Sequence, residues 1–134
     1  MENISIGFLF SKDRKFVSLI KRKEDSSELI KLTGIGGHIE IGESALDAMI
    51  REFEEEAGLK IDSWKQFAVL RIKDVTVNVF KAFSDDLYQI QTKEKDMARF
   101  YSVHSLYLYD SWYNVKYLTE MALDDSIINS TIIY

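Results

Sequence analysis

Hydrophobic runs separated by polar segments predict a series of strands along the chain. Short runs rich in β-branched and aromatic residues are typical of strands, and the polar segment 11–14 is expected to form the turn between the first two. The predicted strands are 4–10, 15–22, 65–73, 75–83 and 98–103, and the tail 127–134 is expected to add a terminal strand. A charged loop at 23–28, a glycine-rich bend at 34–37 and a short extended piece at 38–41 are expected before the first helix.

Two segments have the periodicity of helices. In the segment 44–57, Ser44 followed by Asp47 resembles a capping box, and Gly58 stands where a C-terminal glycine stop belongs. A second helix is predicted at 115–123. Strands mixed with two helices predict an α/β sandwich with a mixed central sheet. The length of 134 residues suits a single domain, 1–134.

The first helix is predicted to have two chemically different faces. Ala48 falls among the glutamates Glu52, Glu55 and Glu56, which are spaced i, i+3, i+4 and converge on one side, and its small side chain would leave the space above them open. Like charges at this spacing repel by roughly 0.2–0.5 kcal/mol per pair, so a solvated acidic face is one interpretation and a bound Mg²⁺ is the other. The predicted core face consists of Ala45, Leu46, Met49, Ile50, Phe53 and Ala57.

The segment before this helix adds to the case for a metal. Consecutive glycines at 36 and 37 allow close backbone approach, so their carbonyl oxygens could point at the same cation. Glu43 and Arg51 bracket the first turns of the helix, and we expect Arg51 to pair with Glu43 and to bond carbonyls of the preceding loop. A magnesium ion held here would activate a water molecule and neutralise phosphate charge.

The segment from Gly37 to Leu59 resembles the Nudix box at every defined position. Glu43 follows Gly37 after five residues, and REFEEEAGL begins at Arg51, after seven more. One departure is Ile35, where many Nudix proteins have proline. The resemblance implies a Nudix-type α/β/α sandwich that uses Mg²⁺, with Mn²⁺ as a possible substitute. By resemblance, the metal ligands would be Glu52, Glu55, Glu56 and the carbonyl of Gly36, with Glu43 and Arg51 in supporting roles.

Nudix enzymes often carry a further acidic residue far from the box, which acts as a base or an extra ligand. Asp96 is the preferred candidate here because it precedes the predicted strand 98–103, and Glu94 is the next. The candidate catalytic residues are therefore Glu43, Arg51, Glu52, Glu55, Glu56 and Asp96.

Three residues are candidate substrate contacts: Gly37, His38 and Asn114. A neutral loop histidine is the plainer interpretation of His38, and a surface position is the plainer one for His104. Asn114 lies at the predicted start of the second helix, where it could cap the helix or read a nucleotide base. The aromatic residues around it would mostly pack in the core, and one or two could stack on a base.

The box itself does not identify the substrate. The marks of other Nudix subgroups are missing: the chain has no proline, and Thr76 or its neighbours stand where the diadenosine polyphosphate group often has tyrosine. The remaining resemblance is to MutT-like members, which implies a pyrophosphohydrolase that converts a nucleoside triphosphate into a monophosphate and pyrophosphate. Hydrolysis of a nucleotide sugar or dinucleotide, or a Nudix module that binds without turnover, are the alternatives.

Composition narrows the partners. A net charge of −5 disfavours binding of duplex nucleic acid, which needs a basic face, but it allows small phosphorylated substrates. The chain has no cysteine, which excludes disulfides and thiolate sites. No apolar run approaches the ~20 residues of a membrane helix. We therefore expect a cytoplasmic protein, monomeric or homodimeric, with a small-molecule nucleotide as its substrate.

Overall fold

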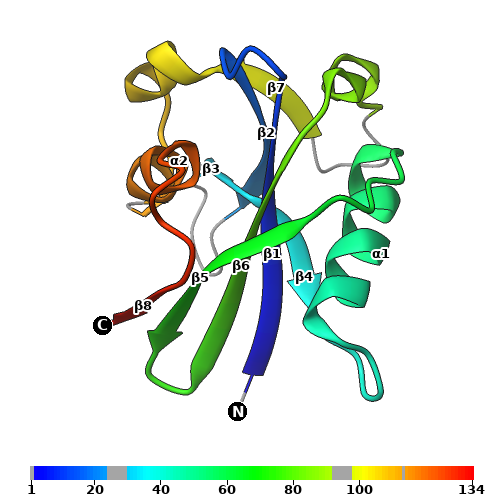
Figure 1. The fold of residues 1–134 in the computed structure, drawn as a ribbon, viewed down its shortest axis with the longest axis vertical. Helices are drawn as coiled ribbons and strands as arrows, with labels where there is room; N and C mark the ends of the chain where they lie inside the picture. The colour runs from blue at the N-terminus through cyan, green and yellow to red at the C-terminus, as the bar shows by residue number, and fades with distance from the viewer. Residues whose placement is uncertain (1, 24–29, 92–97, 113) are drawn as a thin grey trace.

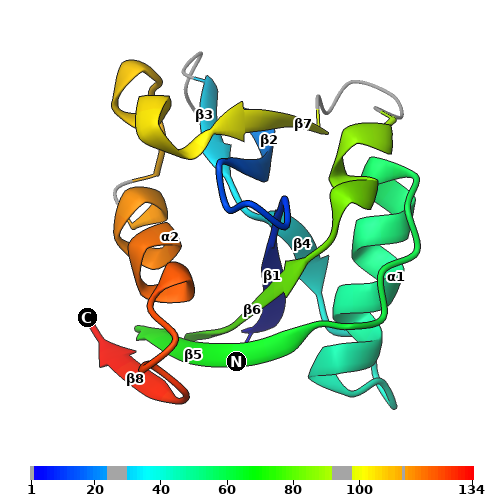
Figure 2. The ribbon, with the colours of Figure 1, turned by 45° about the horizontal axis from the view of Figure 1, so that its top comes forward.

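A computed structural model describes residues 2–23, 30–91, 98–112 and 114–134. A mixed sheet is covered by one α-helix on each side, α1 (Ala45–Ala57) and α2 (Val115–Leu123) (Figures 1 and 2). The strands are β1 (Glu2–Phe10), β2 (Phe16–Lys23), β3 (Ile30–Thr33), β4 (Ile35–His38), β5 (Lys65–Ile72), β6 (Val75–Phe83), β7 (Ala98–Ser102) and β8 (Ser130–Ile133), and the 3₁₀ helices are η1 (Asp85–Gln89) and η2 (Val103–Leu108). The predicted α/β/α sandwich with a mixed sheet is confirmed.

The sheet is built around β1. The strand order is β3-β2-β1-β6-β5-β8, with β4 also paired to β1 and β7 also paired to β2. β1 runs parallel to β6 and β5 runs parallel to β8, whereas the other pairs are antiparallel. β2 meets β1 at the Phe10–Val17 pair, and β4 lies beside the earlier part of β1, from Ile4 to Gly7.

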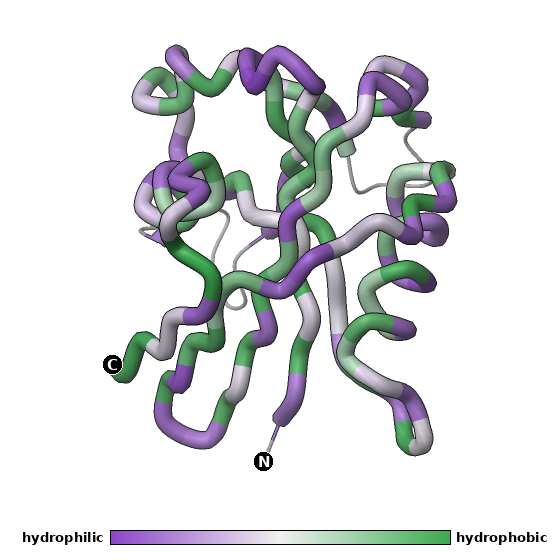
Figure 3. The backbone as a smooth tube through the Cα atoms, viewed as in Figure 1, coloured by the Kyte–Doolittle hydropathy of each residue, from purple (hydrophilic) through white to green (hydrophobic). Residues whose placement is uncertain are grey.

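Successive residues of β1 supply two separate cores, as the alternation of strand side chains requires. Leu9 packs with Met49 and Phe53 of α1 on one side of the sheet. Phe8 packs with Leu118 of α2 on the other side. In Figure 3 the turns of α1 alternate between hydrophobic and hydrophilic segments, as expected for a helix that buries one face.

The glycine-rich bend is the main error in the predicted strands. Residues 35–38 form β4, which pairs Gly36 with Ile6 and Gly37 with Ser5. An added Cβ on Gly36 would lie 1.9 Å from the carbonyl oxygen of Ser5, so this strand can approach β1 only with glycine there. Ile35, which stands where proline was expected, is fully buried in β4. The short edge strand β3 was not predicted.

The predicted faces of α1 are partly wrong. Ala48 does not leave open space beside the glutamates, because it is fully buried where α1 packs on the sheet. Leu46, assigned to the core, is exposed instead. Of the helices that the structure describes, none is both long and apolar enough to cross a membrane.

Candidate functional site

The position of α1 is fixed at both ends by the caps that the sequence predicts. The Ser44 hydroxyl accepts a hydrogen bond from the backbone N–H of Asp47 at 3.0 Å. At the other end, Gly58 has a left-handed backbone with φ of 76°, and its N–H donates to the carbonyl of Glu54 at 3.0 Å. These caps set where the helix starts and stops, and with it the directions in which the glutamates project.

Arg51 ties the helix to the segment before it, as predicted. Its Nε donates to Glu43 Oε2 at 2.7 Å and its Nη2 donates to Glu43 Oε1 at 2.9 Å. Nη2 also donates to the backbone carbonyl of His38 at 3.1 Å. The hydrogen bonds from Arg51, with one from the Glu40 N–H, lower the pKa of Glu43 to about 2. Bonding to Glu43 and Glu52 raises the pKa of Arg51.

Two of the three helix glutamates share the same guanidinium. Arg51 Nη1 lies 2.9 Å from Glu52 Oε1 and 3.3 Å from Glu55 Oε2. Glu52 is mostly buried against β4, whereas Glu55 is more than half exposed. An added Cβ on Gly37 would lie 2.7 Å from the carboxyl group of Glu52, so the glycine of the box provides the space in which this carboxylate lies.

Glu56 is held by a residue that the sequence interpretation missed. Arg22, on β2, donates through Nη2 to Glu56 Oε1 at 2.6 Å and to the Gly36 carbonyl at 2.8 Å. The structure thus brings together Gly36 and Glu56, both candidate metal ligands, around one cationic group. Arg22 lies two residues after the buried Ile20 in β2, so both side chains project from the same face of the sheet. A charged residue at this inward-facing position was the sequence feature that could have identified Arg22.

The candidate ligands offer oxygen atoms that can bind a cation, but each of the two arginines contacts a different pair of them. Arg51 contacts Glu52 and Glu55, whereas Arg22 contacts Glu56 and the Gly36 carbonyl. Within the described ranges, no group of three or more acidic or histidine side chains is gathered closely enough to hold a metal ion. The donor set of carboxylates and one carbonyl nevertheless has the chemistry that Mg²⁺ prefers.

His38 and Asn114 contribute no side chain to this cluster. The His38 side chain is largely exposed, with its Nε2 3.6 Å from Glu2 Oε2, and only its backbone carbonyl reaches Arg51. Asn114 begins α2, on the opposite side of the sheet from α1 (Figure 2). Asp96 and Glu94 fall outside the residues that the structure describes.

Asn114 lines a pocket of about 320 Å³ with Tyr117, Ile132 and Tyr134. Among the described residues its side chain makes no capping hydrogen bond, and its φ and ψ of −91° and −8° are helical rather than extended. The structure therefore gives Asn114 no capping role and leaves its amide at the wall of a pocket that contains two aromatic rings.

The edge strand β3 lies beside the segment that precedes α2. Leu32 of β3 bonds the backbone of Asp110 and Trp112, just before α2. Its neighbour Lys31 pairs across the strands with Arg22, and the Lys31 Nζ lies 5.5 Å from the centroid of the Trp112 ring. Lys31 thus lies near Trp112 and pairs with Arg22, the residue that bonds Glu56.

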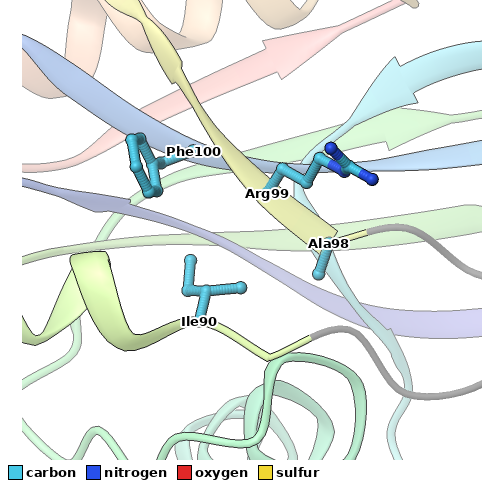
Figure 4. Close-up of a pocket in the computed structure, with 4 residues that line it drawn as sticks. All are labelled: Ile90, Ala98, Arg99 and Phe100. Carbon is cyan, nitrogen blue, oxygen red and sulfur yellow. The ribbon is translucent and has the colours of Figure 1, made fainter.

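A different pocket, of about 340 Å³, lies at the start of β7 (Figure 4). Ile90 and Ala98 face one another across it, and Arg99 and Phe100 complete the lining. The candidate glutamates of α1 are not among these lining residues.

Comparisons with known proteins identify the family and the fold. The family model of the NUDIX domain matches residues 2–120. No curated protein matches the chain. Among solved structures, a MutT from work on Aliivibrio salmonicida and Vibrio cholerae has 22% identity and a TM-score of 0.78, covering 91% of this chain and 96% of its own.

Two further structures show the same fold. The MutT protein of Bacillus halodurans has 15% identity and a TM-score of 0.75, covering 100% of this chain and 90% of its own. A NUDIX family hydrolase of Clostridium perfringens has 22% identity and a TM-score of 0.76, covering 92% of this chain and 96% of its own. Since the family model spans nearly the whole chain and the box residues are complete, the protein belongs to the Nudix family of hydrolases.

Proposed function

We propose that the protein is a Mg²⁺-dependent pyrophosphohydrolase that cleaves a phosphoanhydride bond in a nucleoside diphosphate linked to another group. The observation that carries the proposal is the pairing of the Gly36 carbonyl with the Glu56 carboxylate around one guanidinium. Two oxygens that jointly accept one cationic group are suited to accept another. Glu52 and Glu55, on the same helix, would complete an oxygen-rich metal site.

The metal would supply an activated water and charge neutralisation at the phosphates. The protein's own residues have separate tasks. Arg51 keeps the β4 end and α1 in register through Glu43 and His38, so the carboxylates stay aligned with the Gly36 carbonyl. Glu52, Glu55, Glu56 and Asp96 are the candidates for the group that takes the proton of the attacking water.

We further propose that the preferred substrate is a nucleoside triphosphate, with a purine base, cleaved to a monophosphate and pyrophosphate. The base would stack in the pocket of Tyr117 and Tyr134 and exchange hydrogen bonds with the Asn114 amide. The phosphates would run past Lys31 and Arg22 toward the glutamates, along the edge of the sheet.

The test is a substrate screen with and without chelator. Purified protein should release pyrophosphate from purine nucleoside triphosphates with Mg²⁺ or Mn²⁺, and excess EDTA should abolish the release. Turnover that survives chelation would overturn the metal mechanism. A much higher kcat/KM for a nucleotide sugar or dinucleotide would overturn the triphosphate assignment, and tight binding with no cleavage would identify a binding module instead.

A further inference from the structure

The two arginines beside α1 contact the candidate ligands in different ways. Arg51 also bonds Glu43 and the His38 carbonyl, neither of which is a candidate ligand. Both hydrogen bonds described for Arg22 go to candidate ligands, and both come from the same nitrogen, Nη2. Arg51 therefore bonds residues outside the proposed metal site, whereas Arg22 bonds two of its candidate ligands with one nitrogen.

A guanidinium and a divalent cation cannot both bind these oxygens at low cost. Mg²⁺ binds oxygen ligands directly at roughly 2.0–2.1 Å, which would place it close to a guanidinium nitrogen bonded to the same two oxygens. The two positive charges would repel strongly at such a separation, because the Glu56 side chain is largely withdrawn from water. Binding of one therefore weakens binding of the other.

We propose that Arg22 is an internal counter-ion that competes with the divalent cation for the Gly36 carbonyl and the Glu56 carboxylate. The inference rests on the metal site of the proposed function. Metal binding then requires the Arg22 side chain to leave both oxygens, so this positioning residue sets how much free metal the site needs. Before metal binds, the guanidinium offsets repulsion among the glutamates and stabilises the packing of α1 on β4.

The alternative is that Arg22 supports the metal site by holding Gly36 and Glu56 in place. The two roles predict opposite changes when the guanidinium is removed. A supporting residue would weaken metal binding when lost, because its ligands would drift apart. A competitor would tighten it, because the metal would no longer have to displace a charge-assisted hydrogen bond from each ligand.

The decisive experiment measures Mn²⁺ binding to the intact chain without nucleotide, by titration calorimetry and by the electron paramagnetic resonance of free Mn²⁺. We expect Arg22→Gln to bind Mn²⁺ at least about tenfold more tightly than the unaltered protein, the scale of losing one charge-assisted hydrogen bond. Its melting temperature without metal should fall, and the rise on adding Mn²⁺ should be larger than in the unaltered protein.

Lys21→Gln is the matched control. It removes the same charge from the neighbouring position of β2, and its side chain projects to the opposite face of the sheet. We expect its Mn²⁺ affinity to stay within about twofold of that of the unaltered protein, because water screens the interaction between the Lys21 ammonium and the metal ion. An equal increase in Mn²⁺ affinity in Lys21→Gln and Arg22→Gln would show that the change in net charge causes the effect, and would overturn the proposed competition.

A second variant guards against loss of folding. Arg22→Lys keeps the charge on a shorter side chain, which should compete less well and give an affinity between those of the unaltered protein and Arg22→Gln. Unchanged or weaker Mn²⁺ binding in these variants, with binding retained in the unaltered protein, would overturn this inference and leave the proposed function intact. Failure of the unaltered protein to bind Mn²⁺ would overturn both.

Discussion

The two sides of the sheet use arginine and lysine differently. On the α2 side, Arg14 donates to the carbonyl of Leu123 at 3.0 Å, and the buried Lys81 donates to that of Ala122 at 2.8 Å. Both cations satisfy carbonyls at the C-terminal end of a helix, where positive charge is favourable. Arg14 also bonds the exposed carboxylate of Asp125. On the α1 side, Arg22 and Arg51 bond carbonyls too, but their partners include Glu56 and Glu52, two carboxylates that a single helix presents together.

This difference indicates that the cationic residues of the α2 side stabilise the fold, whereas those of the α1 side contact the proposed reactive groups. Burial lowers the pKa of Lys81, and its ammonium group donates to a carbonyl at the end of α2, with Asp124 and Asp125 nearby, so its contacts fasten α2 to the sheet. The arginines of the α1 side bond carboxylates that would otherwise repel one another, and carboxylates are ligands that Mg²⁺ prefers. Under the proposed function, the reaction takes place on the α1 side and the nucleoside is recognised on the α2 side.

The largest effects should follow from neutralising the carboxylates of the α1 side. Glu56→Gln and Glu55→Gln keep the size of each side chain and remove one charge, so steady-state turnover of a purine triphosphate should fall by at least about 100-fold. Folding should survive, because the amide has the shape of the carboxyl group and Glu56→Gln can still accept a hydrogen bond from Arg22. Glu54→Gln removes a charge from an exposed position of the same helix and should retain nearly full activity. Near-normal rates in both Glu55 and Glu56 variants would contradict the ligand assignment.

We expect an intermediate loss of activity from a change in the residues that hold these carboxylates in place. Glu43→Gln removes the charged partner of Arg51, and loss of such supporting contacts typically lowers activity by about 10- to 100-fold. The folded-state pKa of Glu43 lies near 2, below its ordinary value of 4.5, so its contribution to stability is present above pH 4.5 and is lost as the pH falls toward 2.

Thermal melting across pH measures this contribution. The unaltered protein should melt at a higher temperature than Glu43→Gln at neutral pH, and the gap should narrow below about pH 4, because the variant has no proton to gain there. Glu40→Gln is the control: Glu40 is exposed and lies 3.9 Å from the same arginine, so its loss should change the melting temperature little. A gap that stays constant down to pH 2 would show that the ionised carboxylate is not what stabilises the fold.

The two sides also differ in how far the sequence predicted them. α1 was predicted with its caps, because Ser44 and Gly58 act within one turn of the helix. β4 was mistaken for a bend, because the need for glycine at 36 comes from the carbonyl of Ser5, a distant residue. Arg22 was missed for the same reason, since its partners lie 14 and 34 residues away.

On the α2 side the predicted elements are confirmed, whereas the predicted contact of Asn114 with a base is not tested. The helix 115–123 and a strand within the tail are confirmed as α2 and β8. The periodicity of the segment gives no indication that Tyr117 and Tyr134 line one pocket, because pairing of β5 with β8 brings the tail to α2. Asp96 stays a prediction, as does the base-reading role of Asn114.

The smallest effect should come from Asn114, and it concerns selectivity rather than rate. A side chain that caps a helix typically contributes about 1 kcal/mol, but Asn114 makes no such bond among the described residues, so Asn114→Ala should leave the melting temperature nearly unchanged. Loss of the amide should raise KM for purine triphosphates severalfold with little change in kcat, because the base lies away from the bond that breaks. Pyrimidine triphosphates should be affected less, which lowers the discrimination between bases.

Tyr117→Leu should instead weaken binding of every base, since stacking is tolerant of base identity. If Asn114→Ala leaves discrimination unchanged while Tyr117→Leu raises KM, the pocket holds the base without reading it through Asn114. If neither variant changes KM, the nucleoside binds elsewhere, and the α2 side serves packing alone.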